Sequence, residues 1–228
     1  MIVWLASYPR SGNTFLRMLL YRAFGTNTLS LYDDNGEIGA KPEFSDIVGH
    51  ISHGMDITRF YEAASHSNQS YFVKTHELPH DDAKAIYIVR DGRAAIVSYY
   101  HYIQNFNQMT VPLSDLIAGK IWPCGWSSHV NAWALSGRPN TLVLRFKDLV
   151  ADNMQYMTRI ADFIGLPAPK SASVDFAQLQ EQFPKFFRSG SNEKNAAEIQ
   201  GEDLRLFWKL HGETMERMGY ADRIANSA

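Results

Sequence analysis

Cysteine is almost absent from the 228-residue sequence, which contains only Cys124. A single cysteine excludes an intrachain disulfide and a four-cysteine metal site. The N-terminal apolar run covers only Met1–Ala6 and has no basic segment before it, which argues against a secretory signal. No stretch reaches the roughly 18–20 apolar residues of a membrane span. We therefore expect a protein of the reducing cytoplasm.

A strong net charge of either sign is also missing. The chain has 22 Lys and Arg against 24 Asp and Glu, a formal charge of −2. A nearly neutral protein does not attract nucleic acid or an anionic membrane as a whole, so neither is expected as a partner. Any anion site must be local, and residues 1–30 contain three arginines with no Asp or Glu. The oligomeric state is left open.

Short apolar stretches alternate with amphipathic ones along the chain. Strands are expected at 2–6, 71–75, 85–90 and 141–145, and helices at 14–24, 57–64, 92–104, 113–118, 153–164 and 201–218. This alternation predicts a three-layer α/β fold with a central parallel sheet covered on both faces. Ligands of such folds bind at the carboxyl ends of the strands. The loops after residues 6, 74 and 90 should therefore share one edge of the sheet.

The first candidate anion site is the loop Ser7–Thr14 between a strand and a helix. Gly12 lets the backbone approach an anion, and amides at the positive end of the helix would point at it. Arg10 adds a fixed positive charge. The pattern GxxxxGK[ST] is absent, which disfavours an ATPase or kinase that holds a magnesium triphosphate. An ordinary capped strand-to-helix turn is the alternative. The possible donors are the side chains of Ser11, Asn13 and Thr14 and the amides of Asn13, Thr14 and Phe15.

A second candidate group follows the strand at 71–75. Lys74 and His76 face the same way because side chains alternate along a strand. A histidine can take a proton near neutral pH, and a lysine beside it can stabilise charge on a transferring group. A hydrogen-bonded structural histidine is the alternative for His76.

A third candidate group spans a strand, a turn at Asp91-Gly92 and a helix. Arg90 ends the strand and Ser98 lies two turns into the helix, a combination that suits a phosphate. A surface ion pair of Arg90 with Asp91 or Asp148 is the alternative.

These three segments together resemble the sulfotransferase family. Ser7–Thr14 resembles its loop Tyr-Pro-Lys-Ser-Gly-Thr-Thr-Trp, with Arg10 in place of the lysine and Phe15 in place of the tryptophan. Residues 72–79 look like Lys-Thr-His-Leu-Pro with Glu77 inserted. The sequence from Arg90 to His101 is similar to Arg-Asn-Pro followed by Val-Ser-Tyr-Tyr-His.

The resemblance implies one domain, 1–228, with the P-loop NTPase-like sulfotransferase architecture and acceptor loops at about 26–70 and 103–128. It implies transfer of a sulfuryl group from 3′-phosphoadenosine 5′-phosphosulfate (PAPS) to a hydroxyl or amine of a small acceptor. Adenosine 3′,5′-bisphosphate (PAP) would be the product, and no metal is needed. His76 would be the general base, Lys74 would contact the sulfuryl end, and Arg90 and Ser98 would bind the 3′-phosphate. Catalysis is thus expected from His76, Lys74 and Arg10, and donor binding from Arg10, Ser11, Gly12, Asn13, Thr14, Phe15, Arg90, Ser98, Phe146, Arg188 and Gly190.

Several assignments keep an alternative. Phe146 stands where the family has a tyrosine near the adenine, but it could be plain core. Arg188 and Gly190 resemble a late loop over the 3′-phosphate, but that loop could be solvated. A histidine metal site lacks a third ligand at a convincing spacing. A small-molecule P-loop kinase and a non-catalytic nucleotide-binding module are the rival functions.

Overall fold

The computed structural model describes residues 1–32, 42–52, 54–106, 108–171, 174, 181 and 192–220. The chain divides into two compact units, each of which is described by itself. Unit 1 comprises the described residues of Met1–Ser7, Gly12–Ile88 and Gly137–Val174. Unit 2 comprises those of Tyr8–Ser11, Val89–Ser136 and Asp175–Ala228. The single domain expected from the sequence stays a prediction.

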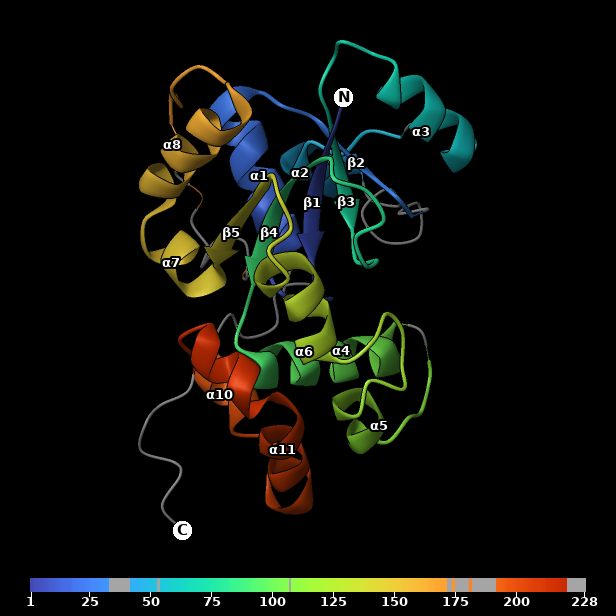
Figure 1. Ribbon diagram of the computed structural model, residues 1–228, viewed down its shortest axis with the longest axis vertical. Helices are drawn as coiled ribbons and strands as arrows, with labels where there is room; N and C mark the ends of the chain where they lie inside the picture. The colour runs from blue at the N-terminus through green and yellow to red at the C-terminus, as the bar shows by residue number, and fades with distance from the viewer. Residues whose placement is uncertain are drawn as a thin grey trace. The chain divides into compact units, whose positions relative to one another are not determined.

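A parallel sheet forms the centre of unit 1, as predicted. Its strands are β1 (Ile2–Ser7), β2 (Thr28–Ser30), β3 (Tyr71–Thr75), β4 (Lys84–Val89, whose last residue is counted with unit 2) and β5 (Thr141–Arg145). Their order is β2-β3-β1-β4-β5 (Figure 1). The pairs β1–β3, β1–β4 and β2–β3 are parallel. Every residue of β1 is buried, as expected for a central strand that is covered on both faces.

The helices of unit 1 begin and end where the sequence supplies caps. They are α1 (Asn13–Phe24), α2 (Pro42–Val48), α3 (Ile57–Ser65), α7 (Phe146–Ala151) and α8 (Asn153–Ile164). Asp56 and Asp152 accept backbone N–H bonds at the starts of α3 and α8. Gly25 ends α1 in the left-handed conformation, with φ 66°. Helix α1 packs against α2 and α8, which fixes the helix that follows the first candidate loop.

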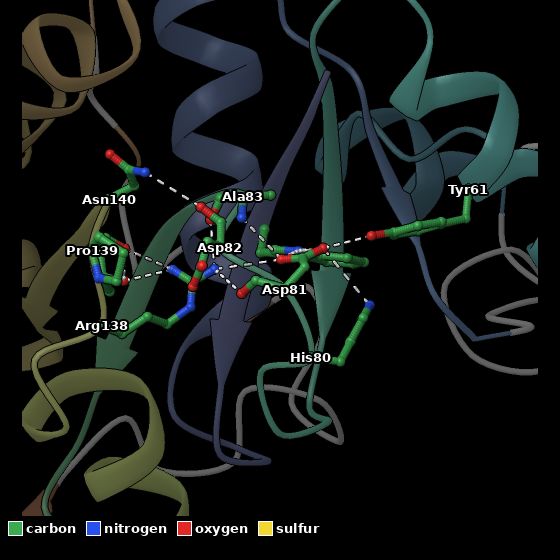
Figure 2. A network of polar contacts seen from close by, with 10 residues as sticks. Tyr61, His80, Asp81, Asp82, Ala83, Arg138, Pro139 and Asn140 are labelled. Carbon is green, nitrogen blue, oxygen red and sulfur yellow. Dashed lines mark hydrogen bonds and ion pairs between the residues drawn. The ribbon is translucent and has the colours of Figure 1, made fainter.

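The connection from β3 to β4 runs through residues 76–83 without a helix. Asp81 anchors it: the Tyr61 hydroxyl donates to its Oδ2 at 2.8 Å (Figure 2). Trp4 Nε1 donates to its Oδ1 at 3.0 Å. Arg138 donates to the carbonyls of Asp81 and Ala83 at 2.9 and 2.6 Å. A half-buried carboxylate surrounded by donors holds this short connection against β1 and against the turn before β5.

Unit 2 is helical. Its helices are α4 (Gly92–Asn105), α5 (Leu113–Ile117), α6 (Trp126–Val130) with a π-helical continuation (Asn131–Leu135), α10 (Asn192–Ala196) and α11 (Gly201–Arg217). His211 of α11 is buried; its Nε2 lies 2.9 Å from the Ile117 carbonyl, and its Nδ1 lies 2.8 Å from Ser127 Oγ. These contacts attach α11 to the end of α5 and to α6.

The short elements β2, α2, α7 and α10 were not expected from the sequence. Two of them, β2 and α2, lie in the stretch 26–70, which was expected to hold an acceptor loop. The predicted strands and long helices are confirmed to within one residue at each end. None of the helices in the described ranges is long and apolar enough to cross a bilayer.

Candidate functional site

Gly12 gives the first candidate loop its shape. Its φ of 104° is a conformation that side-chain-bearing residues rarely adopt. A Cβ at this position would lie 2.3 Å from Cδ2 of Phe146, so the ring of Phe146 lies directly on the glycine. Phe146 also packs edge-to-face against Phe15, with ring centroids 6.1 Å apart, and is 5% exposed. The ring thus supports the loop; its contact with adenine stays a prediction.

The start of α1 suits an anion. The helix begins at Asn13 and its first turn contains no acidic residue. The first amides of a helix have no carbonyl acceptor within it, and the helix dipole is positive there. The side chain of Asn13 is used differently from our expectation, because its Nδ2 donates to the Leu5 carbonyl at 2.8 Å and lies 3.3 Å from Ser7 Oγ. Asn13 therefore ties the helix start to the end of β1.

His76 is placed by the register of the sheet. Ala6 pairs with Thr75, so Ser7 and His76 leave β1 and β3 at the same level. His76 Nδ1 lies 2.7 Å from the Ser7 carbonyl oxygen, which can only accept. We assign the ring proton of the neutral histidine to Nδ1 on this geometry, so Nε2 is the unprotonated nitrogen. The arrangement suits His76 for taking up a proton at Nε2.

Lys74 is buried beside this histidine in unit 1, with 8% of its surface exposed. Its Nζ lies 5.7 Å from the centroid of the Tyr32 ring, within the range of a cation–π contact. Tyr32 was missed by the sequence analysis, because nothing near it in the chain resembles a motif. It follows the three-residue strand β2, which has no clear pattern of its own.

Unit 2 brings Arg10, Arg90 and Ser98 together. Arg90, which is 6% exposed, donates from Nη1 to the Arg10 carbonyl at 3.1 Å. Arg10 Nε donates to Ser98 Oγ at 3.4 Å. Arg10 has φ 63°, a costly conformation for a residue other than glycine and one that clusters at functional sites. Its guanidinium also lies 5.2 Å from the centroid of the Tyr102 ring.

These two arginines create an excess of positive charge. Burial, followed by the charge of the neighbouring Arg10, lowers the pKa of Arg90 to about 10, whereas Asp91 opposes the shift. Asp91 itself is engaged by Arg93, at 2.7 Å between Nη2 and Oδ2. A group with two negative charges would relieve the repulsion between the guanidinium groups, and a phosphate matches their fork geometry.

Ser11 adds a buried hydroxyl in unit 2. It is 0% exposed, and its Oγ has no hydrogen-bond partner among the described residues. Buried polar atoms are rarely left in that state in native proteins, so the orphaned hydroxyl fits a site that receives a ligand.

The predicted residues thus form two groups. Unit 1 holds Gly12, Asn13, Thr14, Phe15, Lys74, His76 and Phe146, and unit 2 holds Arg10, Ser11, Arg90 and Ser98. Arg188 and Gly190 lie outside the described residues. Arg10 was expected at the bridging oxygen; its side chain lies next to Ser98, and a role at the bridge stays a prediction.

The described ranges contain no group of three His, Cys, Asp or Glu side chains placed to hold a metal ion. His50 has its Nδ1 2.8 Å from Arg17 Nη2 and accepts from it. His53 lies outside the described residues.

Comparisons with known proteins bear on the family and the fold of this chain. The family model "Sulfotransferase domain" matches residues 2–219. Flavonol 3-sulfotransferase of Flaveria bidentis is 29% identical over 184 residues, which cover 72% of this chain and 57% of that protein. The chain therefore spans little more than half the length of this relative.

Two solved structures share the fold. Mouse sulfotransferase SULT7A1 complexed with PAP superposes with a TM-score of 0.68 at 21% identity, covering 94% of this chain and 84% of that chain. Retinol dehydratase in complex with androsterone and the inactive cofactor PAP gives 0.66 at 19% identity, covering 99% and 83%. With a family model that spans almost its whole length, the chain belongs to the sulfotransferase domain family.

Proposed function

We propose that this protein transfers a sulfuryl group from PAPS to a hydroxyl or amine of a small acceptor, with His76 as the general base. The observation that carries the proposal is the 2.7 Å contact between His76 Nδ1 and the Ser7 carbonyl. It leaves Nε2 as the nitrogen that takes the acceptor proton while the acceptor oxygen or nitrogen bonds to sulfur. The bond between sulfur and the bridging oxygen breaks, and PAP leaves with that oxygen.

Each group of residues, taken by itself, suits one part of the donor. The amides at the start of α1 would hold the 5′-phosphate, where no acidic side chain repels it. Arg90 and Ser98, with Arg10 in contact with both, would hold the 3′-phosphate. Lys74 would neutralise charge on the sulfuryl oxygens. Two of the similar proteins bind PAP, which supports this donor.

The acceptor class rests on the similar proteins. One is named for a flavonol and another was solved with androsterone, and both compounds are small molecules with hydroxyl groups. We extend that class to this chain. The reaction as written involves no metal ion, and the single cysteine is compatible with work in the cytoplasm.

The decisive experiment combines calorimetry with transfer of radioactive sulfate from PAPS to a panel of phenols, alcohols and amines. PAP should bind, and chelation of metals by EDTA should leave transfer unchanged. His76→Asn should lower turnover by at least ~100-fold while PAP affinity is retained. His80→Asn, at a side chain that is 53% exposed, is the matched control.

The outcomes separate the rivals. Phosphoryl transfer from ATP that requires magnesium would establish the kinase. PAP binding without any transfer would establish a nucleotide-binding module. Full turnover in His76→Asn would assign the base to another residue, and the absence of any heat from PAP at millimolar protein would overturn the donor assignment.

A further inference from the structure

Tyr32 is brought to the proposed catalytic pair by strand register. Ser30, the last residue of β2, pairs with Lys74 of the parallel strand β3. Tyr32 and His76 each follow this pair by two residues, so they lie side by side just beyond the ends of β2 and β3. All four residues belong to unit 1.

Three contacts connect Tyr32 with the pair. The backbone N–H of His76 donates to the Tyr32 hydroxyl oxygen at 2.7 Å. The rings of Tyr32 and His76 are nearly parallel, with an interplanar angle of 13° and centroids 5.9 Å apart. The ammonium of Lys74 lies 5.7 Å from the centroid of the same ring. One tyrosine therefore touches both the group assigned to proton transfer and the group assigned to charge neutralisation.

We propose that Tyr32 is a positioning residue for the transfer reaction: its ring orients Lys74 and the His76 imidazole, and its hydroxyl holds the His76 backbone. The proposal rests on the function proposed above and deepens it. Tyr32 acts through its two neighbours and need not touch the substrate.

The chemistry of the ring explains why a tyrosine suits this place. The face of an aromatic ring attracts cations, and Lys74 is one such cation in the resting protein. His76 becomes another when it takes the acceptor proton, so the ring favours the charge that develops as the reaction proceeds. Burial is the main cause that raises the pKa of the Tyr32 phenol, and the negative charge of Glu77 raises it by a smaller amount. The phenol is therefore neutral at physiological pH and adds no negative charge beside Lys74.

Two substitutions divide the effects of the ring and the hydroxyl. Tyr32→Leu removes both, and Tyr32→Phe keeps the ring and removes only the hydroxyl. Tyr61→Phe is the matched control, because it removes a tyrosine hydroxyl that bonds to Asp81 at 2.8 Å elsewhere in unit 1. The first readout is kcat with PAPS and the best acceptor of the panel, measured beside the calorimetric Kd for PAP.

The expected result is a split between turnover and donor binding. Tyr32→Leu should lower kcat roughly 10-fold and Tyr32→Phe by about 3-fold, because the ring contributes more than one neutral hydrogen bond. PAP affinity should not change in either variant, and Tyr61→Phe should keep wild-type kcat. A parallel loss of kcat and PAP affinity would assign Tyr32 a purely structural role, and wild-type kcat in Tyr32→Leu would also overturn the proposal.

The second readout needs no turnover. Nitrogen-15 NMR of the histidine rings, with His76 assigned from its loss in His76→Asn, should show the proton on Nδ1 in the wild type. In Tyr32→Leu the two ring nitrogens should shift toward averaged values, and an unchanged spectrum would overturn the proposal. If Tyr32→Leu does not fold, an unshifted His76 backbone amide in Tyr32→Phe would overturn it. A wild type that transfers sulfate to no acceptor would refute the proposed function alone, and the NMR result would still decide the role of Tyr32.

Discussion

The ring of Phe146 occupies the space that a side chain at Gly12 would need, with Cδ2 only 2.3 Å from the position of a Cβ. Phe146, the first residue of α7, thus leaves no room for a side chain at Gly12 of the candidate phosphate loop.

Gly12→Ala should destabilise the protein more than strain in the backbone alone explains. A side chain in the left-handed region costs about 1–2 kcal/mol, and overlap with Phe146 should add about 1–3 kcal/mol. Urea denaturation measures the change in the free energy of unfolding. Gly25→Ala, at the other end of α1, has φ 66° and no atom within 4 Å of its Cβ position, so it isolates the backbone cost. Equal losses in the two variants would contradict the role of Phe146.

Arg90→Ala should remove the preference for a 3′-phosphate. We expect the Kd for PAP to rise about 10- to 100-fold, the value of charge-assisted hydrogen bonds, while the Kd for adenosine 5′-phosphate is unchanged. Calorimetry with both nucleotides measures the difference. Arg205→Ala is the control, because Arg205 also belongs to unit 2 and its side chain is 72% exposed. A loss of affinity of the same size for both nucleotides would contradict the assignment of Arg90 to the 3′-phosphate.

Removal of the Asp81 carboxylate should loosen the connection that follows His76. Asp81→Ala leaves the Trp4 indole and the Tyr61 hydroxyl without this acceptor and Arg138 without its nearby charge, so we expect a loss of about 3 kcal/mol in the free energy of unfolding. Chemical denaturation provides the measurement.

The neighbouring substitution Asp82→Ala is the natural control, because that residue is exposed. Its effect should lie within about 0.5 kcal/mol, as for other surface changes. If the two variants lost the same stability, the network of Figure 2 would not explain how the connection is held.

His211 should make the stability of the protein depend on pH. Burial lowers the pKa of His211 below its ordinary value of 6.5, although the bond to the Ile117 carbonyl opposes the shift. The unfolded chain then binds more protons just below pH 6.5, so the free energy of unfolding should fall as the pH drops from 6.5 toward the lowered value. The loss is about 1.4 kcal/mol for each unit by which the pKa is lowered.

Denaturation curves between pH 7.5 and 5.5 test this directly. His211→Gln should flatten the dependence in that window, whatever its effect on stability at pH 7.5. His66→Gln, at an exposed histidine, should retain the wild-type slope. An unchanged slope in His211→Gln would show that other groups cause the dependence.

Much of the fold was predictable because it depends on local patterns. The pattern of adjacent residues predicts the buried strand at 2–6 and the helix that follows Gly12. The bounds of both elements were predicted to within one residue. The elements that escaped prediction are short: β2 has three residues and α2 seven, too few for a periodicity to emerge.

The spacing of residues within the motifs was also the basis for predicting the candidate site residues. Alternation along a strand predicts that Lys74 and His76 face the same way, although β3 ends at Thr75 and the shared orientation stays a prediction. Ser98 follows Arg90 by eight residues, in the next helix. These spacings can be read from the sequence alone, without the rest of the fold.

Only the tertiary structure decided which distant groups these residues meet. The Ser7 carbonyl fixes the His76 tautomer through the register of β1 with β3, and Tyr32 reaches the same histidine through the register of β2. Arg10 turns to Ser98 through a backbone conformation that its own sequence does not predict. Local patterns determine strands and helices because neighbours along the chain create them. Contacts between strands depend instead on the balance of packing over the whole sheet, which no short stretch of sequence contains.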